Sequence, residues 1–278
     1  MDALRQVDEW GADNAAVAML GRAGELGSHG DRDHEFRLAS VTKLMTALAC
    51  LVAAEEGVID LDEPAGPPGS TIRHLLAHTS GLPFEPGGPP IARPGTRRIY
   101  SNAGFETLAD AVAERAEMPF ADYLGAAVFE PLGLTRTELR GSPAAGVHAP
   151  LADLVVFGAE LLAPTLVSPE TFAEATTVQF PGLSGVLPGV GRFDPLDWGL
   201  GFELKDAKDP HWSGSRTSPR AFGHFGGSGT FLWVDPDVGM ACACLTDREF
   251  GPWALEAWPR LSDAVLDEAA GGPKPARH

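Results

Sequence analysis

The order of hydrophobic patterns along the 278 residues restricts the fold more than any other feature of this sequence. Patterns typical of strands occur twice near the N-terminus and four times near the C-terminus, at 15–20, 24–29, 198–204, 220–225, 229–235 and 239–246. Helical spacing dominates between these two groups. Strands so far apart in sequence can share one sheet only if the two ends of the chain come together. We therefore expect a sheet built from N- and C-terminal segments, with a helical insertion.

Helices and loops alternate through the middle of the chain. Helical patterns are predicted at 40–56, 71–78, 103–117, 119–129, 151–162 and 168–176, and a final amphipathic helix is predicted at about 252–269. Gly and Pro number 33 and 24, and they gather in loop-like stretches at 64–69, 86–95, 181–191 and 210–219. These boundaries predict an α/β sheet subdomain from 1–62 with 196–278, and a mostly helical subdomain from 63–195.

The charge balance limits the partners of the protein. Acidic residues number 38 and Lys plus Arg 21, so the formal net charge is −17. Such a surface repels phosphate backbones and anionic lipids, and we expect neither nucleic acid nor membrane as a partner. The longest apolar stretch, 44–54, falls far short of the ~20 residues of a membrane helix. The acidic N-terminal segment does not resemble an export signal. Cys50, Cys242 and Cys244 are predicted to be free and buried, and we expect a cytoplasmic location.

The sequence Ser40-Val-Thr-Lys43 begins an apolar helix. A serine there lies in the positive field of the helix N-terminus, where an oxyanion is stabilised. A lysine three residues later lies one turn away, so its amine can reach the serine oxygen. A desolvated amine is less basic and can accept the serine proton at neutral pH. The alternative is an N-cap serine beside a solvated lysine, although Lys43 is the one lysine in the first 204 residues.

Tyr100-Ser-Asn102 combines two rare residue types, since Tyr and Asn each occur only twice. A tyrosine can relay protons, and an asparagine amide can hold a lysine or a substrate carbonyl. The alternative is a tyrosine buried at a helix start. His224-Phe-Gly226-Gly227 ends a predicted strand, where glycines let a substrate approach the backbone. The N–H groups of Gly227 and Ser40 could then stabilise an oxyanion.

A metal site is not predicted. His74 and His78 have the spacing of metal ligands on a helix, but neither a glutamate between them nor a third ligand accompanies them. N-capping or loop packing is the better interpretation of both side chains.

Together, Ser40-Val-Thr-Lys43, the string from His74 to Leu82, Tyr100-Ser-Asn102 and His224-Phe-Gly226 resemble the serine β-lactamase and penicillin-binding-protein superfamily, in its class C β-lactamase-like and esterase-like branch. The resemblance covers about 15–269. It implies an α+β fold of the β-lactamase/transpeptidase type, in which helices flank an antiparallel sheet in an αβα sandwich. It also implies an active site between the two predicted subdomains.

The resemblance implies a role for each motif residue. Ser40 is expected to be the acyl-accepting nucleophile, Lys43 its activating base, and Tyr100 the second proton-transfer group. The residues expected to bind substrate are Asn102, His224, Gly226 and Gly227. Neither a cofactor nor a metal is implied, and the expected partner is a small-molecule acyl substrate. Residues 78–82 are interpreted as a structural turn, and the oligomeric state is left open.

The substrate class depends on a departure from the family pattern. His224 stands where β-lactamases and peptidases of this superfamily usually have a lysine that helps bind a substrate carboxylate. This departure, the shorter chain and the absent export signal favour an esterase acting on a small ester or amide. The alternatives are a β-lactamase, a D,D-carboxypeptidase or D-aminopeptidase, an acyltransferase, and a non-catalytic ligand-binding relative. Loops 84–95 and 205–221 are predicted to border the cleft. The candidates for its walls are Phe84, Trp198, Trp212 and Phe225, and the alternative for each is a place in the hydrophobic core.

Overall fold

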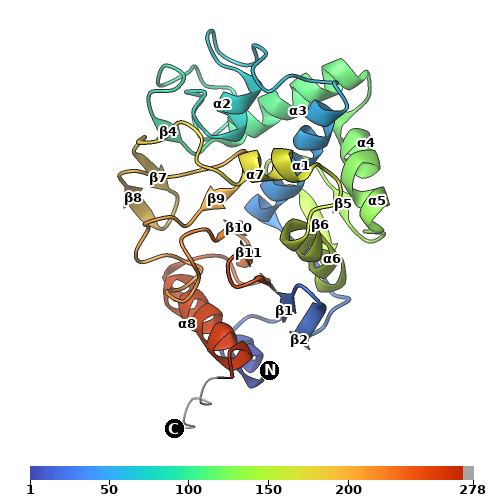
Figure 1. Cartoon of the computed structure of the whole chain (residues 1–278), viewed down its shortest axis with the longest axis vertical. Coiled ribbons are helices and arrows are strands. Elements are labelled where there is room, and N and C mark those ends of the chain that lie inside the picture. Colours follow the sequence, from blue (N-terminus) through green and yellow to red (C-terminus); the bar gives the residue numbers. More distant parts are fainter. Residues whose placement is uncertain (272–278) are drawn as a thin grey trace.

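The structure is a computed structural model that describes residues 1–271 (Figure 1). Its main sheet has six antiparallel strands in the order β2-β1-β12-β11-β10-β9. These strands are β1 (Ala15–Gly21), β2 (Gly24–Gly30), β9 (Glu203–Leu204), β10 (Phe222–Gly226), β11 (Thr230–Asp235) and β12 (Met240–Thr246). Strand β1 pairs with β12 along its whole length, from Ala15 opposite Thr246 to Gly21 opposite Met240. The two ends of the chain therefore form one sheet, as the sequence predicted.

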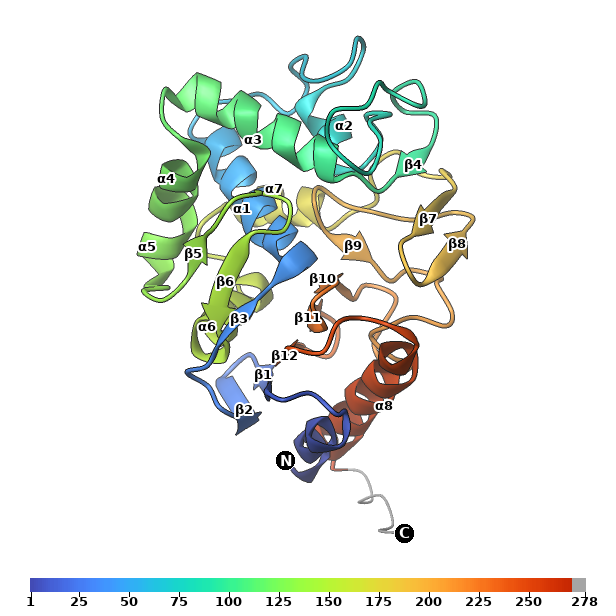
Figure 2. The same ribbon diagram turned by 180° about the vertical axis from the view of Figure 1, so that it is seen from behind.

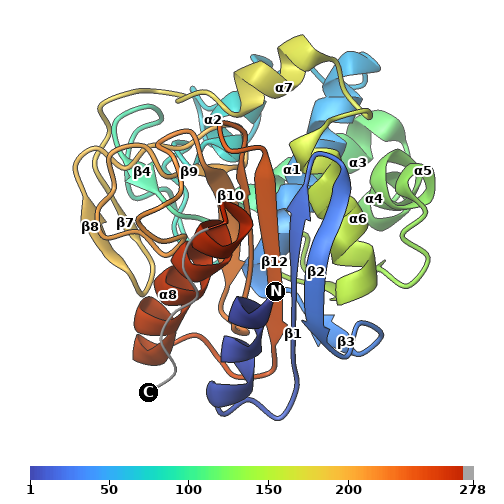
Figure 3. The same ribbon diagram turned by 60° about the horizontal axis from the view of Figure 1, so that its bottom comes forward.

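Strand β1 is buried on both faces because helices cover the sheet on each side. Ala16, Ala18 and Leu20 belong to one hydrophobic core, whereas Val17 and Met19 belong to another. This alternation follows from the two-residue period of a strand. Helix α6 (Leu151–Leu162) contacts β1, β11 and β12 on one side, while α8 (Pro252–Ala269) and the N-terminal 3₁₀ helix η1 (Asp2–Glu9) lie on the opposite side (Figure 3). The fold is the predicted αβα sandwich.

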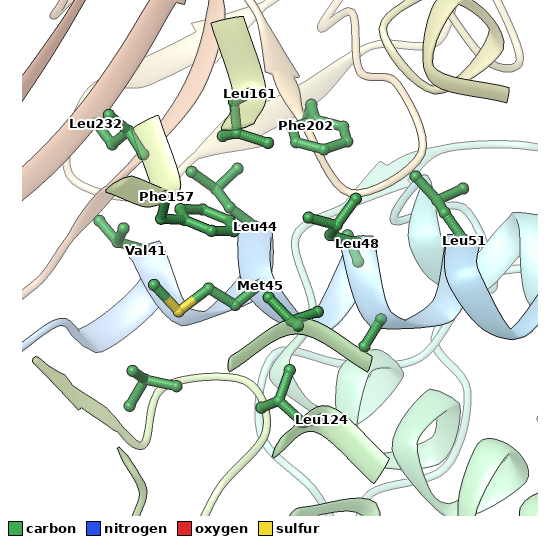
Figure 4. Packing of buried hydrophobic residues seen from close by; sticks show 14 of the residues in the cluster. Val41, Leu44, Met45, Leu48, Leu51, Leu124, Phe157, Leu161, Phe202 and Leu232 are labelled. Atoms are coloured by element: carbon green, nitrogen blue, oxygen red, sulfur yellow. The ribbon is translucent and has the colours of Figure 1, made fainter. Parts of the chain in front are cut away.

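Helix α1 (Thr42–Glu55) passes through the middle of the first core. Leu44 and Leu48 point toward Phe157 and Phe202, whereas Met45 lies on the side of Leu124 (Figure 4). The remaining helices are the 3₁₀ turn η2 (Ala39–Val41), α2 (Ile72–Leu76), α3 (Asn102–Ala116), α4 (Phe120–Leu124), the π-helical η3 (Gly125–Phe129), α5 (Glu130–Leu132) and α7 (Pro169–Ala175). The predicted helices therefore all form, with ends shifted by a few residues. Among residues 1–271, no helix is both long and apolar enough to cross a bilayer.

The middle of the chain also contains two small sheets that the sequence did not predict (Figure 2). They consist of β3 (Glu35–Arg37), β6 (Val147–Pro150) and β5 (Glu138–Leu139), and of β4 (Arg98–Ile99), β7 (Gly185–Leu187) and β8 (Gly191–Phe193). Strands of two to four residues contain too few alternations to produce a periodic signal. The loop expected at 181–191 consequently contains β7.

The strand predicted at 198–204 was too long, because only Glu203–Leu204 forms β9. Two glycines explain the difference. Gly201 has a φ of +85°, and a Cβ on Gly199 would lie 2.0 Å from the Ala175 carbonyl oxygen. The backbone therefore turns and packs closely here instead of continuing as a strand.

Arg98 places β4 against the rest of the molecule. Its guanidinium is buried and donates hydrogen bonds to the carbonyl oxygens of Leu196 at 2.6 Å, Ala77 at 2.5 Å and Gln179 at 2.7 Å. Burial lowers the pKa of Arg98 to about 10, so the side chain remains a cation at neutral pH. These hydrogen bonds hold three separate segments around Arg98, which directly precedes Ile99 and Tyr100.

Candidate active site

Ser40 lies in the short turn that joins β3 to helix α1. Thr230 Oγ1 donates to the Leu38 carbonyl at 2.8 Å, and the Leu38 N–H donates to Val147 O at 2.8 Å. Directly after Leu38, which makes both of these bonds, Ala39 adopts a φ of +46°, a conformation that non-glycine residues rarely adopt. The sharp turn leaves Ser40 half-buried at the start of the helix. Such strain persists only where the surrounding structure holds it, and it is common at active sites.

Lys43, about one helical turn after Ser40, is completely buried. Its Nζ lies 2.7 Å from Asn102 Oδ1, 2.9 Å from Ala144 O and 3.4 Å from Ser40 Oγ. Burial lowers the pKa of Lys43 to about 7, and the nearby carboxylate of Glu106 offsets only part of this effect. A neutral amine has two N–H donors, and the oxygens of Asn102 and Ala144 accept both. Its lone pair is then available to the Ser40 hydroxyl.

Asn102 is the first residue of α3, and the serine before it caps that helix. Ser101 Oγ accepts a hydrogen bond from the Gly104 N–H at 2.8 Å and donates one to Pro83 O at 2.6 Å. The Asn102 N–H donates to Phe84 O at 2.9 Å. The middle residue of Tyr100-Ser-Asn102 therefore fixes the helix start, which holds the asparagine amide against Lys43.

Tyr100 and His224 meet through a hydrogen bond whose direction can be deduced. His224 Nδ1 lies 2.6 Å from Phe225 O, and a carbonyl can only accept, so Nδ1 carries the proton. Burial, aided by Lys43, lowers the pKa of His224 to about 3, so Nε2 is unprotonated. Nε2 then accepts from the Tyr100 hydroxyl at 3.2 Å. Burial also raises the pKa of Tyr100, against a smaller effect of its hydrogen bond with Ser40, so the phenol keeps its proton.

His78, which the sequence predicts to lie in a structural turn, is a neighbour of this site. Its ring centroid lies 4.6 Å from that of Tyr100 and 4.9 Å from that of Trp198, and Nδ1 accepts the Ser101 N–H at 3.1 Å. Burial lowers the pKa of His78 well below its usual value. Within the described residues, its Nε2 has no hydrogen-bond partner. In the sequence, the signal that could have indicated His78 was its position in the string from His74 to Leu82. His74, in the same string, packs on Phe180 and not on Tyr100.

The two glycines at the end of β10 differ in their surroundings. A Cβ on Gly226 would lie 2.3 Å from Leu38 O and 2.4 Å from Thr230 Oγ1, so this glycine allows β10 to pack against the turn that carries Ser40. Gly227 is exposed and has open space around it. The structure thus brings the end of β10 to the turn that carries Ser40, while the oxyanion role of the Gly227 N–H remains a prediction.

A buried ionic cluster anchors the predicted loop 205–221 to strand β9, the neighbour of β10 in the sheet. Glu203 accepts hydrogen bonds from Trp212 Nε1 at 2.5 Å and from His211 Nε2 at 3.1 Å, and Lys208 Nζ lies 3.2 Å away. Burial alone would raise the pKa of Glu203, but His211 and Lys208 outweigh it and lower the pKa to about 2. Of the four predicted wall residues, Trp198, Trp212 and Phe225 are buried in the second core, and only Phe84 is exposed.

Comparison with known proteins supports the fold and the family resemblance. Residues 12–266 match the family model described as Beta-lactamase. The crystal structure of a beta-lactamase (Mb2281c) from Mycobacterium bovis is 55% identical, with a TM-score of 0.94, and the match covers 96% of this chain and 98% of that chain. Simvastatin synthase (LovD) from Aspergillus terreus is 20% identical, with a TM-score of 0.79 over 98% of both chains, which is a likeness of fold.

A curated relative matches over a shorter region. The D-alanyl-D-alanine-carboxypeptidase/endopeptidase AmpH of Escherichia coli (strain K12) is 31% identical in an alignment of 147 residues, and the match covers 40% of this chain and 38% of AmpH. The match thus spans well under half the length of that relative. Because the family model covers nearly the whole chain and the fold agrees, the chain belongs to the beta-lactamase family of serine hydrolases.

Proposed function

We propose that this protein hydrolyses small, uncharged esters through an acyl-enzyme on Ser40. The neutral amine of Lys43 takes the hydroxyl proton while Ser40 Oγ bonds to the substrate carbonyl carbon. The N–H groups of Ser40 and Gly227 stabilise the resulting oxyanion. When the tetrahedral intermediate collapses, the bond to the alcohol oxygen breaks and Tyr100 gives that oxygen a proton. Lys43 returns its proton to Tyr100, and water then releases the acid by the reverse transfers.

The proposed preference for uncharged esters rests on the neutral state of His224. Its Nδ1–H is bonded to Phe225 O, its Nε2 accepts from Tyr100, and its pKa of about 3 keeps it uncharged at neutral pH. At this position a cation would favour the carboxylate of a penicillin or a D-alanyl-D-alanine peptide. A neutral imidazole with both nitrogens already paired supplies no such attraction.

The second candidate is a β-lactamase or D,D-carboxypeptidase. Two observations favour it: the 55% identity to the M. bovis protein described as a beta-lactamase, and the 31% identity to part of AmpH. This candidate requires another residue to bind the carboxylate of the substrate.

The proposal is tested by labelling with a fluorophosphonate and measuring the intact mass. Wild-type protein should gain one adduct, and Ser40→Ala should gain none. Ser28→Ala is the matched control, because Ser28 lies on β2, at the opposite edge of the sheet from β10 and β9. An adduct that persists in Ser40→Ala would remove Ser40 from its role.

Substrate class is tested by comparing p-nitrophenyl esters with nitrocefin and a D-alanyl-D-alanine peptide. We expect kcat/KM for p-nitrophenyl acetate or butyrate to exceed that for nitrocefin, with no release of D-alanine. Faster turnover of nitrocefin or of the peptide would establish the second candidate instead.

A further inference from the structure

One exposed aromatic ring is held rigidly beside the proposed catalytic tyrosine. Phe84 is 42% exposed, and its ring stacks on that of Tyr100, with centroids 5.9 Å apart and an interplanar angle of 27°. Within residues 1–271, no other Phe, Tyr or Trp is classed as exposed. Isolated exposed apolar residues are common on surfaces, but this ring covers a member of the proposed site.

The backbone around Phe84 is fixed by the same motif that positions Tyr100. The carbonyl oxygen of Phe84 accepts the N–H groups of Asn102 at 2.9 Å and Ala103 at 3.2 Å. The preceding carbonyl, of Pro83, accepts Ser101 Oγ at 2.6 Å. These three bonds join the loop to the first turn of α3, so the ring is presented to solvent in a defined position. A preorganised apolar surface loses little entropy when a ligand packs on it.

We propose that Phe84 is a wall for the alcohol portion of the ester substrate and selects aromatic or branched apolar alcohols. The inference rests on the proposed function, in which the Tyr100 hydroxyl protonates the leaving oxygen. The atoms attached to that oxygen then lie beside the Tyr100 ring, where the stacked Phe84 ring extends the apolar surface. Aromatic contacts of this kind add specificity beyond the buried area itself.

Charge near this wall also restricts the alcohol. Glu85 is exposed next to Phe84 and is close enough to raise the pKa of Lys43 against the effect of burial. Its carboxylate repels an anionic leaving group on the same side of the site. The alcohol portion is therefore apolar and uncharged.

The test uses acetate esters that share one acyl group and differ in the alcohol: ethyl, cyclohexylmethyl and benzyl acetate. Hydrolysis is followed by titration of the released acid. Phe84→Ala should lower kcat/KM for benzyl acetate about fivefold and for ethyl acetate less than twofold. Phe84→Leu, which retains apolar area without a ring, should fall between these values for benzyl acetate and approach wild type for cyclohexylmethyl acetate.

The control variant is Ile91→Ala, since Ile91 lies in the same loop, is 61% exposed and carries no aromatic ring that could stack on Tyr100. It should leave the benzyl-to-ethyl ratio unchanged. Ethyl phenylacetate, with the ring on the acyl side, should respond to Phe84→Ala no more than ethyl acetate does. An equal loss on all esters, a loss confined to ethyl phenylacetate, or an unchanged benzyl-to-ethyl ratio in Phe84→Ala would overturn the inference.

The outcomes also separate this inference from the proposed function. If wild-type protein hydrolyses no ester or Ser40 carries no adduct, the proposed function itself fails. If Ser40 labelling and ethyl acetate hydrolysis persist while the benzyl-to-ethyl ratio does not change in Phe84→Ala, only the role of Phe84 fails. The thermal midpoint of each variant checks that the loop substitution leaves the protein folded.

Discussion

At the scale of single residues, the site depends on a buried amine whose hydrogen-bond partners are neutral oxygens. Lys43 contacts an amide oxygen, a backbone carbonyl and a hydroxyl, all of which are neutral. A carboxylate at one of these positions would stabilise the ammonium form and raise the pKa of Lys43. Neutral partners satisfy the N–H groups and leave burial as the dominant effect. The amine can therefore act as a base near neutral pH.

This environment predicts the pH dependence of acylation. Below its pKa of about 7, Lys43 is protonated and cannot accept the Ser40 proton, so the acylation rate should rise about tenfold per pH unit. Above pH 7 the rate should level off, because His224, with a pKa of about 3, and Tyr100, whose pKa is raised, do not titrate nearby. The measurement is the second-order rate of fluorophosphonate labelling between pH 5 and 9, with the integrity of the probe checked at each pH.

Two variants test whether Lys43 is the titrating group. Glu106→Gln removes the carboxylate that raises the pKa of Lys43, while the amide oxygen can still accept from Ser142 Oγ. The midpoint of the profile should move to lower pH. Lys43→Met should abolish the pH-dependent phase altogether. A midpoint that stays in place in Glu106→Gln, with near-normal labelling in Lys43→Met, would show that another group is the base.

At the scale of elements, the site is the contact between the turn η2 and the end of strand β10. Strand β10 reaches the Ser40 turn because Gly226 has no side chain where Leu38 O and Thr230 Oγ1 approach. Thr230, on the neighbouring strand, also donates to Leu38 O. The motif glycine therefore sets the spacing between two elements, in addition to any contact with substrate.

Substitutions at the adjacent positions Gly226 and Gly227 separate the packing role from a role in substrate contact. Gly226→Ala should reduce the free energy of unfolding by about 1–3 kcal/mol, and should slow labelling of Ser40, because the added methyl group moves β10 away from the turn. Gly227→Ala keeps its N–H and enters open space, so both quantities should stay close to wild type. Urea unfolding and fluorophosphonate labelling provide the measurements. Equal behaviour of the two variants would contradict the packing role of Gly226.

At the scale of the whole molecule, the central sheet separates two hydrophobic cores. The first contains α1, α6 and most of the inserted helices, and the second lies between the sheet and α8. Tryptophan is distributed unevenly between them, since all six side chains belong to the second core or pack against it. Tryptophan fluorescence therefore reports mainly on the α8 side, whereas far-UV circular dichroism reports on the whole chain.

This distribution allows the coupling of the two cores to be measured. Phe157 on α6 is fully buried in the first core near Leu44 (Figure 4), and the described residues of this core include no tryptophan. Phe157→Ala should reduce the free energy of unfolding by about 3–5 kcal/mol. Because both cores share the sheet, the fluorescence and circular dichroism transitions should move together. A shift in the dichroism transition alone would show that the cores unfold independently.

The sequence alone predicted the features that depend on local patterns. The longer strands and helices and the pairing of the chain ends follow from periodicities that repeat over five or more residues, whereas the αβα architecture was implied by the resemblance that the motifs carry. The motif residues Ser40, Lys43 and Tyr100 also stood out, because lysine and tyrosine are rare in this chain. The short strands β3 to β8 escaped prediction because two to four residues contain too few alternations to produce a periodic signal.

Only the tertiary structure decided the chemical state of the site. The lowered pKa of Lys43, the tautomer of His224, the contact of His78 with Tyr100 and the exposure of Phe84 all depend on burial and on atoms contributed by distant segments. Desolvation and hydrogen-bond direction vary over a few ångströms, whereas a sequence motif specifies only which residue types are available. The sequence therefore determined which groups could react, and the fold determined their protonation and the surface that a substrate meets.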